Sequence, residues 1–152
     1  MKAPLASLLT LFMLGGCSQL PRDYLGQWEG DDTPTLGIMN RLTITDTSIS
    51  FGNGENINKP VVCKASYKSE KARTAGQFKL MLHDKRCDYA KAMNPEYLRK
   101  MQSFTIYLSQ HPMGTKSPFS DEADNNITHN KTPFLFIRSE DGSTDYRFSR
   151  VE

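Results

Sequence analysis

Residues 41–51 read RLTITDTSISF and hold the clearest structural pattern in the chain. Apolar residues alternate there with threonine and serine, and a turn residue, Asp46, divides the pattern in two. Because successive side chains of a β-strand point to opposite faces, the alternation predicts two half-buried strands joined by a turn. The apolar face of these strands consists of Leu42, Ile44, Ile49 and Phe51. We place Ile38, which precedes them at even spacing, on the same face.

The same two-residue rhythm recurs along the chain and predicts further strands. The segments that carry it are 61–68, 78–82, 104–108, 134–137 and 146–148. Every residue of 134–137 is apolar, so we expect that strand to be buried on both faces. About eight short strands predict a mainly β fold, a single antiparallel β-barrel or sandwich.

One segment departs from the strand rhythm. Asn94-Pro95 is typical of a helix start, with asparagine at the N-cap and proline in the first turn. Apolar residues then recur at helical spacing, which predicts one short helix at about 94–102. Residues 110–132 are polar and rich in turn-forming residues, and we expect a long loop there. Strands alternating with several helices are absent from the pattern, which excludes a doubly wound enzyme fold.

The composition is ordinary for a globular protein and limits the classes of partner. Hydrophobic residues make up 38% and charged residues 24%, which excludes collagen-like and wholly disordered chains. The chain has 19 Lys and Arg residues against 17 Asp and Glu residues. Because phosphate backbones need a concentrated positive field, nucleic acid is not an expected partner.

The N-terminus has the features of a targeting segment. Lys2 precedes an apolar stretch that is too short to span a bilayer and ends in Leu14-Gly15-Gly16-Cys17. This ending resembles the lipobox of bacterial lipoproteins, in which the cysteine receives a lipid and becomes the first residue. The resemblance implies a signal peptide at 1–16, a tether at 17–23 that is lipid-anchored through Cys17, and a single β-rich domain at 24–152.

The same resemblance implies a location. Ser18, and not aspartate, follows the lipid-bearing cysteine, and in the enterobacterial sorting pattern this favours the outer membrane. We therefore expect an outer-membrane lipoprotein whose domain faces the periplasm, with exposure at the cell surface as the alternative.

Two further cysteines, Cys63 and Cys87, remain once Cys17 is assigned to lipidation. The compartment that the lipobox implies is oxidising, and paired cysteines there are normally bridged, so we predict a structural Cys63–Cys87 disulfide. A redox or metal pair that includes His83 is the alternative, but the spacing lacks a Cys-x-x-Cys pattern.

Gly26-Gln27-Trp28 lies in the first predicted strand and resembles the Gly-x-Trp signature of lipocalins and related calycin barrels. In that family the tryptophan plugs one end of the barrel, and a late arginine stacks over it. The resemblance implies that Trp28 is the plug and that Arg147 or Arg150 is its partner.

Other chemistry-bearing residues form no recognisable set. His83, His111 and His129 do not have metal-ligand spacing, and no Gly-x-Ser-x-Gly motif is present, so we expect no metal, no cofactor and no catalytic activity. The region 64–86 is locally basic. Its lysines could protect edge strands from aggregation or could bind anionic partners.

Two functions remain as hypotheses. The first is a non-enzymatic, lipid-anchored module that binds another envelope protein or assists an assembly. The alternative is a lipocalin-like binder of a small apolar ligand, because eight-stranded barrels can enclose one such molecule.

Overall fold

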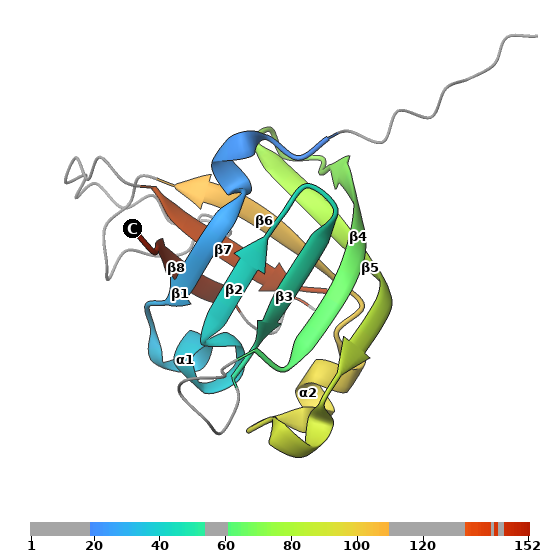
Figure 1. Ribbon diagram of the computed structural model, residues 1–152. Coiled ribbons are helices and arrows are strands. Elements are labelled where there is room, and N and C mark those ends of the chain that lie inside the picture. Colours follow the sequence, from blue (N-terminus) through green and yellow to red (C-terminus); the bar gives the residue numbers. More distant parts are fainter. Residues whose placement is uncertain (1–18, 54–60, 110–132, 141, 143–144) are drawn as a thin grey trace, which may run out of the picture.

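The computed structural model describes residues 19–53, 61–109, 133–140, 142 and 145–152, which form a closed β-barrel (Figure 1). Eight strands follow one another around the barrel, each antiparallel to its neighbours, and β1 pairs with β8 to close the ring. The strands are β1 (Gly26–Gly30), β2 (Arg41–Ile44), β3 (Ser48–Gly52), β4 (Cys63–Lys71), β5 (Gln77–Cys87), β6 (Ser103–Ser109), β7 (Phe134–Ser139) and β8 (Asp145–Arg150). The predicted β fold is confirmed, and the barrel is the right one of the two predicted architectures.

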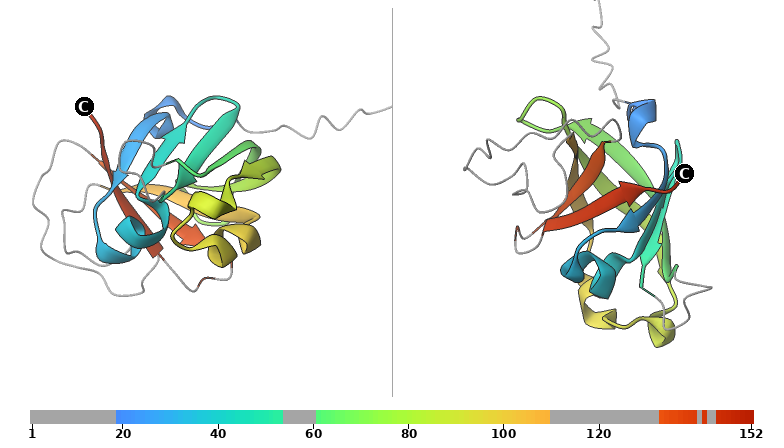
Figure 2. Two further views of the ribbon diagram at one scale, coloured as in Figure 1. Left: turned by 60° about the horizontal axis from the view of Figure 1, so that its bottom comes forward. Right: turned by 90° about the vertical axis from the view of Figure 1, so that its left-hand side faces the viewer.

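Short helices lie at the two ends of the barrel. At one end, which we call the η1 end, the 3-10 helix η1 (Arg22–Tyr24) precedes β1. The opposite end carries α1 (Thr33–Met39), the 3-10 helix η2 (Tyr89–Lys91) and α2 (Pro95–Lys100), and we call it the helical end (Figure 2). The described chain therefore enters the barrel at the end remote from α1 and α2.

Side chains that the strand register places at equal levels build the core. One level contains Trp28, Leu42, Phe51 and Cys63 on successive strands. A second level contains Phe78, Ile106, Ile137 and Tyr146. All of these residues are buried, and the rings of Phe51 and Phe104 meet edge to face with centroids 6.2 Å apart. The inward positions are thus filled by packed side chains, as in other small barrels.

Two finer predictions are confirmed. Strand β7 is buried on both faces, because every residue from Phe134 to Ile137 is buried. Helix α2 begins at Pro95, with Asn94 at the N-cap position as predicted, although it ends at Lys100. The Asn94 side chain does not cap the helix but donates to the Gly37 carbonyl at 3.0 Å, which joins α2 to α1.

The prediction that Ile38 belongs to a strand is wrong, because Ile38 lies in α1. Asp32 caps this helix by accepting from the Thr35 backbone N–H at 2.8 Å, and a proline occupies its first turn. The Asp32-Thr33-Pro34 start is visible in the sequence, but the helix has only seven residues, too few to create a recognisable period.

Two predicted boundaries also need correction. The tether was placed at 17–23, yet Leu20 is buried in the core and η1 begins at Arg22. The strand predicted at 78–82 is longer than predicted, because β5 extends to Cys87. Cys17 itself lies outside the described residues, as do His111 and His129, and their predicted roles remain predictions.

Candidate functional site

The η1 end is closed by the single tryptophan of the chain. Trp28 is fully buried, and its indole N–H donates to the Tyr24 carbonyl at 3.1 Å. The guanidinium of Arg150 lies over the indole ring, 4.4 Å from its centroid. Arg150 also donates to the backbone carbonyls of Leu25, at 3.0 Å, and of Asp23. The Arg150 side chain of β8 therefore binds the segment that precedes β1.

Gly26 makes this closure possible. Its φ of +128° is a conformation that side-chain-bearing residues rarely adopt. A Cβ atom at this position would lie 3.0 Å from Nη1 of Arg150. The glycine that begins the Gly-x-Trp motif therefore provides both the backbone bend and the room for the arginine.

Of the two arginines predicted to stack over Trp28, Arg147 lies elsewhere. It forms an ion pair with Asp31 at 3.2 Å, and both side chains are largely buried. The Arg147 backbone N–H donates to the Thr35 hydroxyl at 2.9 Å, which attaches α1 to β8. Arg150 therefore stabilises the η1 end of the barrel, and Arg147 stabilises the helical end.

The predicted disulfide is present. Cys63 and Cys87 are directly opposite each other on β4 and β5, and their sulfur atoms are bonded at 2.04 Å. The bridge lies where β5 leaves the barrel towards η2 and α2. It therefore ties the start of the helical segment to the wall.

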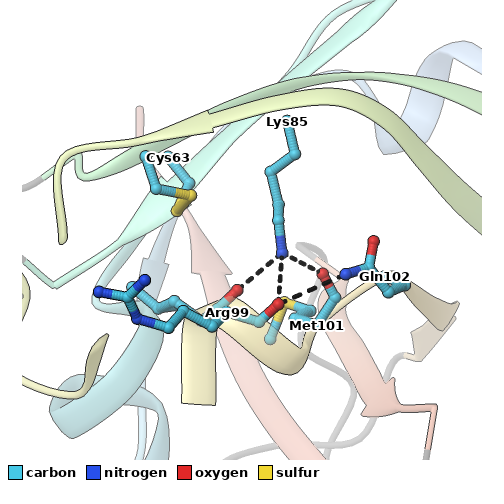
Figure 3. The surroundings of a disulfide bond; sticks show 7 residues. Cys63, Lys85, Arg99, Met101 and Gln102 are labelled. Carbon is cyan, nitrogen blue, oxygen red and sulfur yellow. Dashed lines mark hydrogen bonds between the residues drawn. A yellow bond between two sulfur atoms is a disulfide. The ribbon is translucent and has the colours of Figure 1, made fainter. Parts of the chain in front are cut away.

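Lys85 of β5 binds the C-terminal end of α2 (Figure 3). Its ammonium group donates to the carbonyl oxygens of Leu98 at 2.8 Å, Arg99 at 3.1 Å and Met101 at 2.6 Å. These are carbonyls of the last turn of α2 and the residue that follows it, which lack partners within the helix. Burial lowers the pKa of Lys85, while the three acceptors favour its charged form. No sequence signal predicts this contact, because it joins residues from different elements.

Asn53 joins α1 to the segment between η2 and α2. Its side-chain amide donates to the Leu36 carbonyl and, at 3.1 Å, to the Met93 sulfur. The backbone carbonyl of Asn53 accepts from the Met93 backbone N–H at 3.2 Å. The side chains of Leu36 and Met93 are exposed by 45% and 58%, although their backbones are held in place. Val61 lies two residues before β4, at the helical end, and its side chain is exposed by 37%. We call Leu36, Val61 and Met93 the apolar surface; sequence periodicity did not identify it.

A hollow of about 300 Å³ lies beside α2. Its lining among the described residues consists of Tyr97, Lys100, Met101, Ser139 and Glu140. The Tyr97 hydroxyl is buried and has no hydrogen-bond partner in the described part of the chain. The Tyr97 ring packs edge to face on Tyr146, with centroids 6.0 Å apart. The helical end thus combines exposed apolar side chains with a hollow beside α2.

Residues that could support other chemistry are scattered. His83 contacts Asp84 at 2.9 Å on the exposed surface of β5. Within the ranges that the structure describes, no three potential metal ligands come together. Neither described helix has the length and apolar character required to cross a bilayer.

Comparison with known proteins assigns no family, because no family model, curated protein or solved structure matches this chain.

Proposed function

We propose that this chain is a lipid-anchored accessory protein of the bacterial cell envelope that binds another envelope protein through its helical end. The observation that carries the proposal is the position of the apolar surface. Of the four large hydrophobic side chains exposed in the described chain, three form this surface, and the fourth, Met81, lies on the wall of the barrel. Large exposed apolar side chains that share one end of a domain favour a protein-binding surface at that end.

The apolar surface is well suited to recognition because it is pre-organised. The bonds from Asn53 and Asn94 fix α1 against the segment that leads into α2, and Lys85 fixes the end of α2. A partner that binds such a surface does not need to order it first, which reduces the entropic cost of association. The hollow beside Tyr97 could accept one anchoring side chain of the partner.

Lipid attachment at Cys17 would orient this surface. Leu20 is already packed in the core, so few residues would separate the lipid from the η1 end. The helical end would then face away from the membrane, towards the periplasm of a cell in which the anchor lies in the outer membrane. The proposal assigns the domain no catalytic activity, cofactor or metal.

Site-specific crosslinking in intact cells tests the proposal. A photoreactive amino acid is placed at Leu36, at Met93 and, as the matched control, at Met81, which is exposed but lies on the barrel wall. We expect positions 36 and 93 to give the same crosslinked protein and position 81 to give none. Replacement of Leu36 by Ser should abolish the crosslink from position 93. Equal yields from all three positions would contradict the proposal.

The alternative is that the barrel binds a small apolar ligand. A closed eight-stranded barrel is an architecture that can enclose such a molecule, which favours this function. We rank this function second because the inward side chains of the described strands are packed against one another. Native mass spectrometry of a soluble Cys17→Ser form separates the two, because a discrete mass lost on unfolding would favour the ligand-binding function.

A further inference from the structure

Two basic side chains lie directly opposite each other on the outer wall of the barrel. Lys64 of β4 and Arg86 of β5 are register partners, and both are exposed. Neither forms an ion pair with any residue that the structure describes. Because like charges directly opposite on neighbouring strands repel, this pairing destabilises the free protein. A function that uses both charges would explain why they are adjacent.

Protection of an edge strand does not explain them. In an open sheet, outward lysines prevent edge-to-edge association. Here β4 pairs with β3 on one side and with β5 on the other, and β5 pairs with β6, so neither strand is an edge. The closed barrel therefore removes one of the two explanations that the sequence offered for this basic region and leaves the binding of anions.

The two cations border a hollow of about 460 Å³ on the outside of β3, β4 and β5. Three serine hydroxyls line it as well, from Ser48, Ser50 and Ser66. The hydroxyls of Ser50 and Ser66 have no hydrogen-bond partner within the described ranges. The register of β4 and β5 shifts between Lys64 and Ser66, and such bulges commonly redirect side chains beside binding sites.

Asp84 is the one carboxylate among the residues that line this hollow. It adopts a φ of +53°, and its side chain contacts the His83 ring at 2.9 Å. His83 is the register partner of Ser66. With two cations against one carboxylate, the residues that line the hollow carry a net positive charge.

We propose that this hollow binds a phosphate group, in the form of a phosphomonoester or free phosphate. A phosphomonoester carries a charge of about −1.5 to −2 at neutral pH and is attracted by the net positive charge of the hollow. The arginine can donate two parallel hydrogen bonds, the lysine supplies a point charge, and the serine hydroxyls supply further donors. Bound phosphate would also relieve the repulsion between Lys64 and Arg86. The hollow is lined by none of the residues of the apolar surface, so this proposal does not depend on the proposed function.

Titration of the soluble Cys17→Ser protein with inorganic phosphate, followed by amide NMR, tests the site. We expect shift changes to concentrate at 48–50, 64–66 and 84–86. The double substitution Lys64→Gln with Arg86→Gln should weaken binding by about tenfold or more. The matched control, Lys71→Gln with Arg73→Gln, removes the same charge from the far end of β4 and the turn after it, and should leave the affinity within about twofold. Shift changes elsewhere, or equal weakening by both double variants, would overturn the proposal.

Vesicles distinguish the source of the phosphate. Binding to phosphatidylcholine vesicles that contain phosphatidic acid, lost in the Lys64→Gln with Arg86→Gln variant, would identify a lipid headgroup. Variant-sensitive binding of inorganic phosphate without vesicle binding would identify a soluble phosphate compound. Absence of both would refute the site.

Discussion

Substitution of Arg150 tests how the barrel is closed. The structure gives this residue three interactions, the stack over Trp28 and the bonds to the carbonyls of Leu25 and Asp23. A stack of this kind contributes about 0.5–2 kcal/mol. A hydrogen bond from a charged donor contributes about 1.5–3 kcal/mol, and we count only the Leu25 bond in full because the Asp23 bond is exposed. Arg150→Ala should therefore lower the free energy of unfolding by about 2–5 kcal/mol.

Trp28 provides the assay, because it is the only tryptophan in the chain. Urea unfolding followed by its fluorescence gives the free energy of unfolding, and the emission maximum of the folded state reports the surroundings of the indole. We expect Arg150→Ala to shift this emission to longer wavelength as water reaches the ring. Arg150→Lys, which keeps the charge but loses the planar donor fork, should lose about half as much stability.

Arg147→Ala is the control. It removes the ion pair with Asp31 at the helical end, so it should lower stability without changing the emission of folded Trp28. If Arg150→Ala unfolds within about 0.5 kcal/mol of the wild type and its emission is unchanged, the arginine does not fasten the η1 end.

Three further substitutions address other parts of the barrel. Cys63→Ser should lower the free energy of unfolding by about 3–4 kcal/mol and the thermal midpoint by about 10–20 °C, because it opens a loop closed by the disulfide; equal melting of oxidised and reduced wild type would count against this. Lys85→Met should cost about 1–3 kcal/mol and raise amide exchange in residues 89–102 more than in the strands, since the carbonyls at the end of α2 lose their donor. Burial raises the pKa of Tyr24 to about 12 from 10.0. The unfolded chain therefore loses this proton first, so stability should fall between about pH 10 and 12 in the wild type and less steeply in Tyr24→Phe, as denaturant midpoints at each pH would measure.

The strands were predictable because alternation is a local property. Leu42, Ile44, Ile49 and Phe51 alternate with polar residues, and each of them is buried. The apolar run at 134–137 likewise indicated a strand that is buried on both faces. The disulfide followed from the number of cysteines and the compartment implied by the leader, with no knowledge of the register.

Contacts between remote elements were not predictable in the same way. Arg147 and Arg150 are three residues apart on one strand, and the sequence offered no means of choosing between them, because only the closed ring shows which level of β8 meets Trp28. The apolar surface depends on Asn53 reaching both Leu36 and Met93, which are far apart in the chain. The free charges of Lys64 and Arg86 were visible, but their significance depended on whether β4 was an edge strand.

Pairing of β1 with β8 has a consequence for the order of folding. Every other strand pairs with its neighbour in sequence, whereas the closing contacts join residues as much as 127 positions apart. Synthesis delivers β1 first and β8 last, so the hydrogen-bonding edge of β1 has no partner until almost the whole chain has emerged. A chain truncated before Asp145 would keep seven strands as an open sheet with two exposed edges, the arrangement most prone to associate with other copies. Pairing of the last six-residue strand is thus the step that converts an aggregation-prone open sheet into a closed barrel.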